Sequence, residues 1–407
     1  MTLPSGDTNR PRWAHRGDVQ RTAPTSVSSV RGDVMVYYYP QWHADPVNAE
    51  LHGREWTEWE LIRRARPRFD GHSQPKVPLW GEVDESDPAV ASRAVAAALD
   101  HGIRGFIVDW YWYEDGPFLN RALDEGLLHA DRLDEFTFAL MWANHDWTKL
   151  FPAEHPEPGV LLPAPNGYRP ALRAFAHVIE KYLSHPSYYR VDGKAYFSIY
   201  DIPGFVRGQG SIAEAAALLE AFRTAARAAG AGELHLNAVT TRAVPEATSV
   251  IPALGFDSVT HYTWWHHQES GFDTFPAADY ARIQRLAVDE WSRSTDAFSI
   301  PYLPNVTMGW DPSPRTVEWA MNGEEGYPFT SIAVNNTPER FGEAVRLGLE
   351  HAMASPGPAI VTVNAWNEWT EGSYLEPDVA SGYAYLEALR DGRARALAAD
   401  AVPPAIP

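Results

Sequence analysis

The chain has 407 residues, of which 45% are apolar, so it can bury a large core in one or more domains. Its formal net charge of -19 argues against a nucleic-acid or anionic-membrane partner, because neutralising phosphate groups requires clustered Lys and Arg. It contains no cysteine, which excludes disulfides, thiolate metal sites and a cysteine nucleophile. A neutral substrate fits this composition best.

The N-terminal segment, residues 1–32, is polar and rich in Arg, Pro, Ser and Thr. It lacks the apolar run of about 7 to 15 residues that a secretory signal needs, and no stretch approaches the roughly 20 apolar residues of a membrane span. We therefore expect a disordered tail, a cytoplasmic protein without a membrane partner, and one folded domain over residues 33–399 followed by a short tail at 400–407. The sequence does not indicate an oligomeric state.

Short β-rich runs alternate with longer helical patterns along the folded part, which is typical of βα units and a parallel sheet. Asp87 and Pro88 predict the start of the first long helix, and Gly102 its end. Further helical patterns cover 168–184, 212–229, 245–253, 276–292, 338–354 and 382–398. The expected strands are 34–39, 105–110, 137–142, 195–200, 234–239, 258–262, 302–307 and 359–364.

Eight strand-helix repeats predict a single-domain (β/α)8 TIM barrel of the α/β class. The alternative is an open, doubly wound sheet, which would need a reversal of strand order with longer connections. The segment 40–83 after the first strand lacks periodicity, and a loop of that length is expected to cover the C-terminal mouth of the barrel.

The active site of such a barrel lies at the carboxyl ends of its strands, so the polar and aromatic residues found there are candidate substrate ligands. The first three strands contribute Tyr39, Gln41, Trp42, His43, Asp109, Trp110, Tyr111, Trp142, Asn144, His145, Asp146 and Trp147, and the segment 40–83 contributes Glu58. The fourth, sixth and seventh strands contribute Tyr200, His261, Tyr262, Trp264, Asn305 and Trp310. The eighth contributes Asn364, Trp366, Asn367, Trp369, Tyr374 and Glu376.

Two further residues after the eighth strand, Glu368 and Glu371, are the candidate catalytic groups. Their spacing of three places both side chains on one face of a turn, and neighbouring carboxylates beside apolar Trp have raised pKa values. Cleavage of a glycosidic bond uses two such carboxyl groups, one as acid and one as base or nucleophile. The alternative is a solvated helix face, which the position directly after a barrel strand disfavours.

Aromatic residues make up 12% of the chain and occur in polar strings such as 110–113 and 263–266. Aromatic faces beside hydrogen-bonding groups suit a sugar ring, although some of these residues must simply fill the core. His43, His145 and His261 could form a metal site with an acidic residue, but no His-x-His or His-Glu-x-x-His spacing supports it. We expect hydrogen bonds to sugar hydroxyls, and neither a metal nor a cofactor.

Four segments together carry a family resemblance: 38–43 (YYPQWH), 56–59 (WTEW), 142–147 (WANHDW) and 364–377 (NAWNEWTEGSYLEP). From about residue 34 to residue 389 the chain resembles the WbsX-like proteins, which carry a glycoside hydrolase family 99-like domain. The family 99 enzymes are retaining endo-α-mannosidases. The resemblance implies that Glu368 removes the proton of the sugar 2-hydroxyl, giving a 1,2-anhydro sugar, and that Glu371 is the acid for the leaving group. The two roles are exchanged in the second step.

Three hypotheses about function follow. The first is hydrolysis of an α-glycosidic bond in an oligosaccharide or glycoside, with retention, by a direct nucleophile or by the 2-hydroxyl. The second is glycosyl transfer in polysaccharide or small-molecule glycosylation, which the absence of a nucleotide-binding turn and of an Asp-x-Asp motif disfavours. The third is a barrel that binds glycans without catalysis, which the presence of both carboxylates disfavours. All three imply a carbohydrate partner.

Overall fold

The computed structural model describes residues 31–114, 116–154, 159–240, 245–267, 270–317 and 326–401. Most of the expected N-terminal tail (1–32) and C-terminal tail (400–407) lies outside these ranges. Arg31, at the start of the described part, forms an ion pair of 2.8 Å with Asp400 at the end of the last helix. No helix within the described ranges combines the length and apolarity needed to cross a membrane.

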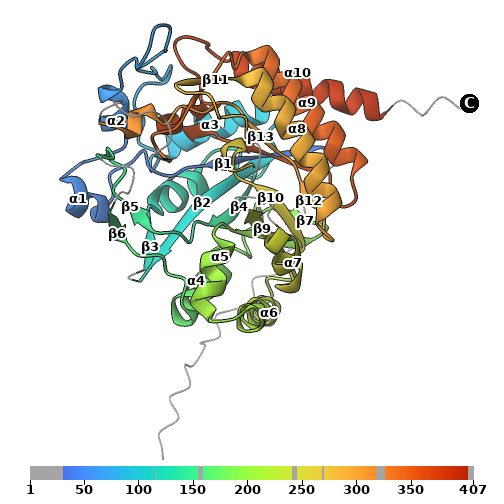
Figure 1. Ribbon diagram of the computed structural model, residues 1–407. Helices are drawn as coiled ribbons and strands as arrows, with labels where there is room; N and C mark the ends of the chain where they lie inside the picture. The colour runs from blue at the N-terminus through green and yellow to red at the C-terminus, as the bar shows by residue number, and fades with distance from the viewer. Residues whose placement is uncertain are drawn as a thin grey trace, which may run out of the picture.

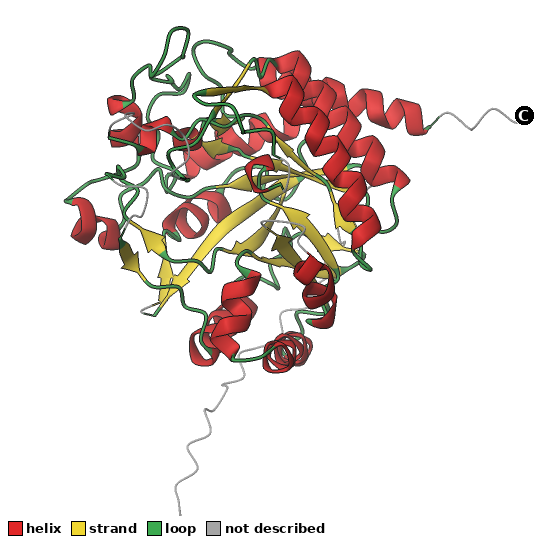
Figure 2. Ribbon diagram, viewed as in Figure 1, coloured by secondary structure: helices red, strands yellow, loops and turns green. Residues whose placement is uncertain are grey.

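The strands form a ring of parallel neighbours, which confirms the predicted barrel (Figures 1 and 2). In chain order its strands are β1 (Asp33–Tyr38), β2 (Gly105–Tyr113), β4 (Thr137–Trp142), β8 (Lys194–Ile199), β9 (Leu234–Thr240), β10 (Ser258–His261), β12 (Tyr302–Leu303), β13 (Asn305–Thr307) and β15 (Ile360–Asn364). Consecutive strands pair along the chain, and the first also pairs with the last, β1 with β15. That pairing excludes the open, doubly wound sheet.

The seventh strand closes the ring in two halves. Pro304 separates β12 from β13, because proline has no backbone N–H for the ladder. β12 pairs with β10, whereas β13 pairs with β15. The Pro304 carbonyl still accepts a hydrogen bond of 3.0 Å from the amide of Thr362, so the contact with the eighth strand continues past the proline.

Helices cover the outside of the ring, as the periodic patterns predict. They are α3 (Pro88–Asp100), α4 (Tyr168–Lys181), α5 (Ile202–Gln209), α6 (Ile212–Ala228), α7 (Pro245–Ala253), α8 (Tyr280–Ala297), α9 (Pro338–Ala354) and α10 (Ala384–Asp400). As expected, the Asp87 carboxylate caps α3 by accepting a hydrogen bond from the amide of Ala89, and Gly102 follows that helix with a positive φ of 80°.

One predicted helix begins later than expected, and one of the eight expected strand-helix repeats lacks its α-helix. α8 begins at Tyr280 rather than at residue 276, because 277–279 form β11 (Ala277–Asp279), which pairs with β14 (Ile332–Val334). Within the described ranges, the connection from β2 to β4 contains no α-helix, only a π turn (Ala122–Gly126) and a 3₁₀ turn (Leu127–His129). A Cβ at Gly126 would lie 2.1 Å from the carbonyl oxygen of Glu85, so the chain passes too closely here for a regular helix with side chains on this face.

The segment 40–83 contains two short helices, α1 (Pro46–His52) and α2 (Trp59–Arg64), and it packs on the loop after the seventh strand. His72 and Gln74 bond one oxygen of Asp311 at 2.8 and 2.6 Å, and Arg68 donates to the carbonyl of Thr316 at 2.9 Å. The segment therefore braces one rim of the barrel mouth. Small strands complete the structure: β3 (Gly116–Phe118), β5 (Trp147–Thr148), β6 (Val160–Leu162), β7 (Arg190–Val191), β16 (Asn367–Glu368) and β17 (Ser373–Tyr374).

The last two helices, α9 and α10, lie side by side (Figure 1) and cross at glycines. A Cβ at Gly392 would lie 2.3 Å from the carbonyl oxygen of Gly342, and a Cβ at Gly342 would lie 2.7 Å from that of Ala388. These backbones touch without intervening side chains.

We predict that Gly392→Ala destabilises the protein by about 1–3 kcal/mol, because the added methyl must push the helices apart. The change would otherwise stabilise an isolated helix, since alanine has the higher helix propensity. Urea denaturation measures the effect. Ala398→Ser, at an exposed position of the same helix, should stay within about 0.5 kcal/mol of the parent. Equal stability of Gly392→Ala and the parent would contradict the packing argument.

Candidate active site

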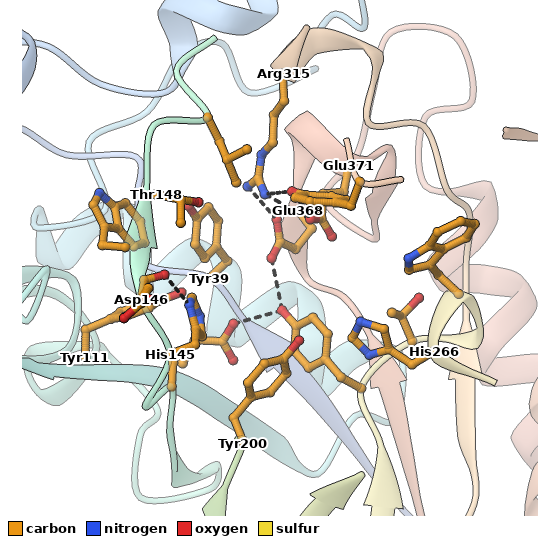
Figure 3. Close-up of a pocket in the computed structure, with 18 of the residues that line it drawn as sticks. Tyr39, Tyr111, His145, Asp146, Thr148, Tyr200, His266, Arg315, Glu368 and Glu371 are labelled. Carbon is orange, nitrogen blue, oxygen red and sulfur yellow. Dashed lines mark hydrogen bonds and ion pairs between the residues drawn. The ribbon is translucent and has the colours of Figure 1, made fainter. Parts of the chain in front are cut away.

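A cavity of about 330 Å³ opens at the carboxyl ends of the barrel strands (Figure 3). Both candidate catalytic residues line it, and both are nearly buried, with 4% of Glu368 and 7% of Glu371 exposed. The other predicted site residues that line it are Tyr39, Asp109, Tyr111, His145, Asp146, Trp147, Tyr200, Tyr262 and Trp310.

The backbone after β15 explains why the two glutamates face one cavity. β16 and β17 pair as antiparallel strands around a 3₁₀ turn, Trp369–Glu371, so Glu368 lies just before the turn and Glu371 at its end. Gly372 closes the turn with a φ of 63°, and a Cβ there would lie 2.5 Å from the Asp311 Cβ. Glycine is therefore required both for the left-handed backbone and for the contact with the seventh-strand loop.

One guanidinium, that of Arg315, binds three carboxylates at the top of the cavity, and Figure 3 shows it beside two of them, Glu368 and Glu371. Its nitrogens lie 2.9 Å from Glu371, 3.4 Å from Glu368 and 3.1 Å from Glu58. Arg315 is itself only 6% exposed. Among the described residues that line the cavity it is the only Lys or Arg, so it supplies the positive charge that lets acidic groups gather there.

A fourth carboxyl group joins this cluster through Tyr262. The Tyr262 hydroxyl lies 2.8 Å from Asp109 and 2.9 Å from Glu368. A phenol has one hydrogen and can donate it to only one of the two, so the other contact is satisfied when that carboxyl group carries a proton. Burial raises the pKa of both groups well above their ordinary values, and the negative charge of Glu371 raises the pKa of Glu368 further.

Glu58 lies behind Arg315 and is completely buried. Burial raises its pKa from 4.5 to about 7, although the charge of Arg315 acts in the opposite direction. Glu371 is held differently, because it accepts hydrogen bonds from the Tyr327 hydroxyl at 2.7 Å and from Arg315. Four acidic groups thus share one cation, and some of them hold protons near neutral pH.

Aromatic rings flank the carboxylates. Thr148 and His266 lie on opposite sides of the cavity in Figure 3. In the sequence Thr148 directly follows Trp147, and His266 directly follows Trp265. On one side Trp147 stacks on Phe151 at 5.2 Å between ring centroids, and on the other Trp265 stacks on Trp310 at 5.8 Å. Such paired rings present flat apolar faces of the kind that pack on sugar rings.

Several predicted ligands form a supporting layer beneath the cavity instead of lining it. Asn367 joins the first and eighth strands by bonding the amide and carbonyl of Tyr39, both at 2.8 Å. Glu376 accepts hydrogen bonds from the indoles of Trp366 and Trp369 at 3.2 and 2.7 Å. Gln41, Trp42, His43 and Tyr374 are also buried and do not line the cavity, and Glu58 lies behind Arg315.

The remaining predicted ligands are buried in the barrel wall or between neighbouring loops, where they do not line the cavity. Asn144 ties the third loop to the fourth, because it bonds the backbone of Asp201 at 2.7 and 2.9 Å and the side chain of Asn166 at 2.6 Å. Trp264 donates to the carbonyl of Asn305 at 2.7 Å. The others are Trp110, Trp142, His261 and Asn364. For all of these residues a role in substrate binding stays a prediction.

The cavity also contains residues that the sequence analysis did not assign to the site, chiefly Arg315 and Tyr327. They lie on the long connection after the seventh strand, where no motif marks them. The sequence did contain one indirect signal for Arg315. Several carboxylates gathered at the predicted mouth of the barrel need a nearby cation. The other unassigned lining residues are Met141, Ala143, Thr148, Leu150, Phe151, Thr263, Trp265 and His266. Within the described residues, no three His, Asp or Glu side chains are grouped so that they could hold a metal ion.

Residues 34–389 match the family described as Glycosyltransferase WbsX. The chain belongs to this family. The resemblance drawn from the four motifs is thereby confirmed. The protein WxcX from two strains of Xanthomonas campestris pv. campestris is 28% identical over 379 residues, which cover 89% of this chain and 50% of WxcX. The chain of this WbsX-family protein therefore spans about half the length of the curated relatives it matches.

Solved structures with the same fold include the GH99 endo-α-mannosidase from Bacteroides thetaiotaomicron in complex with bis-tris-propane. Its TM-score is 0.60 at 14% identity, over 91% of this chain and 99% of that chain. A structure described as a glycoside hydrolase-like protein also has a TM-score of 0.60, at 15% identity over 92% of this chain and 97% of the other. At such identities the likeness shows that the WbsX-family chain shares the (β/α)8 barrel fold of these structures.

The raised pKa of Glu58 predicts a pH dependence of stability. Between pH 4.5 and about 7 the folded state keeps a proton that the unfolded state has lost, so stability falls as pH rises through this window. Glu58→Gln removes this effect. We predict that the variant gains roughly 3 kcal/mol over the parent between pH 4.5 and 7, as about 2.5 pKa units imply.

Urea denaturation at pH 5 and pH 7.5 measures this difference. Glu387→Gln, at an exposed position on α10, serves as the matched control and should follow the parent at both pH values. A constant difference between Glu58→Gln and the parent at both pH values would show that Glu58 is ionised throughout.

Proposed function

We propose that this WbsX-family protein hydrolyses an α-glycosidic bond in an oligosaccharide or glycoside, with retention of configuration. The observation that carries the proposal is the pair Glu368 and Glu371, which share one aromatic-walled cavity and one guanidinium. Glycosidic cleavage requires two carboxyl groups in different protonation states on a bound sugar. The cavity wall is rich in rings and hydroxyl groups and carries surplus negative charge, which favours a neutral sugar over an anionic one.

In the proposed first step Glu368 takes the proton of the sugar 2-hydroxyl, and O2 attacks C1. The bond from C1 to the leaving oxygen breaks, and Glu371 gives that oxygen its proton. The products are an alcohol and a 1,2-anhydro sugar. In the second step water attacks C1 while Glu371 takes a proton from it. The bond from C1 to O2 breaks, and Glu368 returns its proton to O2.

The assignment of the two roles follows the motif positions in the family resemblance, and the burial of Glu368 supports its role as the base. A sugar hydroxyl group is a weak acid, so a base with a pKa above that of an ordinary glutamate removes its proton more readily. Burial raises the pKa of Glu368 in this direction. The acid role of Glu371 rests on its motif position, since in this structure its carboxylate accepts hydrogen bonds from Tyr327 and Arg315. A direct attack of a carboxylate on C1 is the alternative route. A 2-O-methyl glycoside separates the two routes, because it blocks participation of O2 while leaving C1 open to a carboxylate.

We predict that Glu371→Gln lowers the rate of glycoside hydrolysis by about 10²–10⁴-fold, since the variant can no longer give a proton to the leaving oxygen. Release of sugar from a panel of α-glycosides, with the anomer identified by NMR, measures the rate and the stereochemistry. Glu350→Gln on α9 should keep full activity, and circular dichroism should show both variants folded. Parent-level hydrolysis by Glu371→Gln would remove the proposal.

The family description favours a second candidate, glycosyl transfer. In that reaction the same carboxyl pair would activate an acceptor hydroxyl in place of water. Turnover of a nucleotide-sugar donor, followed by release of the nucleoside diphosphate, would favour transfer over hydrolysis. A cytoplasmic location also remains part of the proposal, and fractionation of the producing cells tests it.

A further inference from the structure

A second cavity, of about 450 Å³, lies beside the catalytic one. Two residues, His145 and Tyr200, line both cavities, so the two share a wall. The second cavity is formed at the same mouth of the barrel, by the chain that follows β8 and β9: α5, the start of α6, and α7. Its volume is within the range of pockets that hold small molecules.

The lining of the second cavity is mainly hydrocarbon. Apolar side chains come from three helices and one strand end: Ile202, Pro203, Val206, Ile212, Val239, Ala247, Val250 and Ile251. Polar groups in the lining include Asp201 and Arg207, which form an ion pair at 3.9 Å, and the exposed Glu246. Such walls offer few hydrogen-bonding partners for the hydroxyl groups of a sugar, and the single arginine is already paired with a carboxylate.

The shared wall lies close to the proposed reacting groups. Tyr200 packs on Tyr262 at 5.6 Å between ring centroids, and Tyr262 bonds Glu368 directly. The His145 ring lies 5.4 Å from the Tyr200 ring, and Figure 3 shows both beneath the carboxylates. A group that leaves the catalytic cavity past these two rings therefore enters an apolar space.

We propose that the second cavity binds an apolar alkyl or aryl aglycone, and that the substrate of this protein is an amphipathic glycoside. The inference rests on the proposed function, because the glycosidic bond must lie at Glu368 and Glu371 for the aglycone to reach the second cavity. The sugar lies among the rings and hydroxyls of the first cavity. The hydrocarbon group passes His145 and Tyr200 and is buried between α5 and α7.

The test compares methyl, n-butyl and n-octyl α-D-mannopyranosides, and the matching α-D-glucopyranosides, below their micellar concentrations. Each methylene that becomes buried should raise kcat/KM by about fourfold, as a transfer free energy of about 0.8 kcal/mol per methylene implies. We expect the octyl glycoside to exceed the methyl glycoside by at least about tenfold. Val206→Trp, which fills the second cavity from α5, should remove this preference while leaving the methyl glycoside rate unchanged.

Two variants keep the result interpretable. Val250→Asp places a charge in the same cavity from α7 and should also remove the preference, so a folding defect of one variant alone cannot decide the outcome. Leu172→Trp adds the same indole at an exposed position on α4, outside both cavities, and should retain the preference. Equal kcat/KM for methyl and octyl glycosides in the parent, or an unchanged preference in both cavity variants, overturns the inference.

Failure of the proposed function gives a different result. In that case the parent hydrolyses no glycoside, and calorimetry measures the binding affinity of the octyl and methyl mannosides instead. The inference then survives as a binding site when the parent binds the octyl compound at least about tenfold more tightly and Val206→Trp does not. Equal affinity for both compounds overturns it. Hydrolysis that is lost in Glu371→Gln but does not depend on chain length supports the catalytic proposal and contradicts only the aglycone site.

Discussion

The pairing of Arg315 with three buried glutamates is the interaction on which the rest of the mouth depends. Taking several carboxylates out of water is unfavourable unless a cation and hydrogen bonds compensate them. Arg315 contacts Glu58, Glu368 and Glu371 within 3.4 Å, and Tyr262 connects Glu368 to Asp109. One cation for four acidic groups leaves the cluster with protons to exchange near neutral pH. A site for proton transfer at a glycosidic bond needs this property.

The long segment after the first strand holds the loop that carries Arg315. Arg315 ends a short 3₁₀ turn, Ser313–Arg315, on the connection after the seventh strand, and contacts with neighbouring loops hold this turn in place. His72 and Gln74 bind Asp311 on that connection, Arg68 binds Thr316, and Gly372 allows the turn of the eighth strand to touch Asp311. The first, seventh and eighth loops thus fix one another. A loop that looks irregular in sequence has a defined structural role.

The sequence predicted the barrel well because its signals are local. Apolar β-rich runs mark each strand, and capping residues such as Asp87 mark helix ends, so strands and helices appear close to their expected positions. The site was predicted in part, because proximity to a strand end does not say which way a side chain points. Glu368 and Tyr262 face the cavity, whereas Trp366 and Asn144 support it from behind. Arg315 follows no strand directly, and only its contacts across the fold reveal it.

Two neighbouring cavities of opposite character limit the chemistry of a ligand more than either does alone. The first is walled by aromatic rings, hydroxyls and carboxylates, and the second mainly by aliphatic side chains. A free oligosaccharide would leave the second cavity unused, and a simple lipid would leave the carboxylates without a partner. The proposed amphipathic glycoside, with a polar and an apolar part, would occupy both, and its two parts would join at His145 and Tyr200, which line both cavities. For a hydrolase or a transferase alike, the bond acted upon would lie near this boundary, because Tyr262 connects it to Glu368.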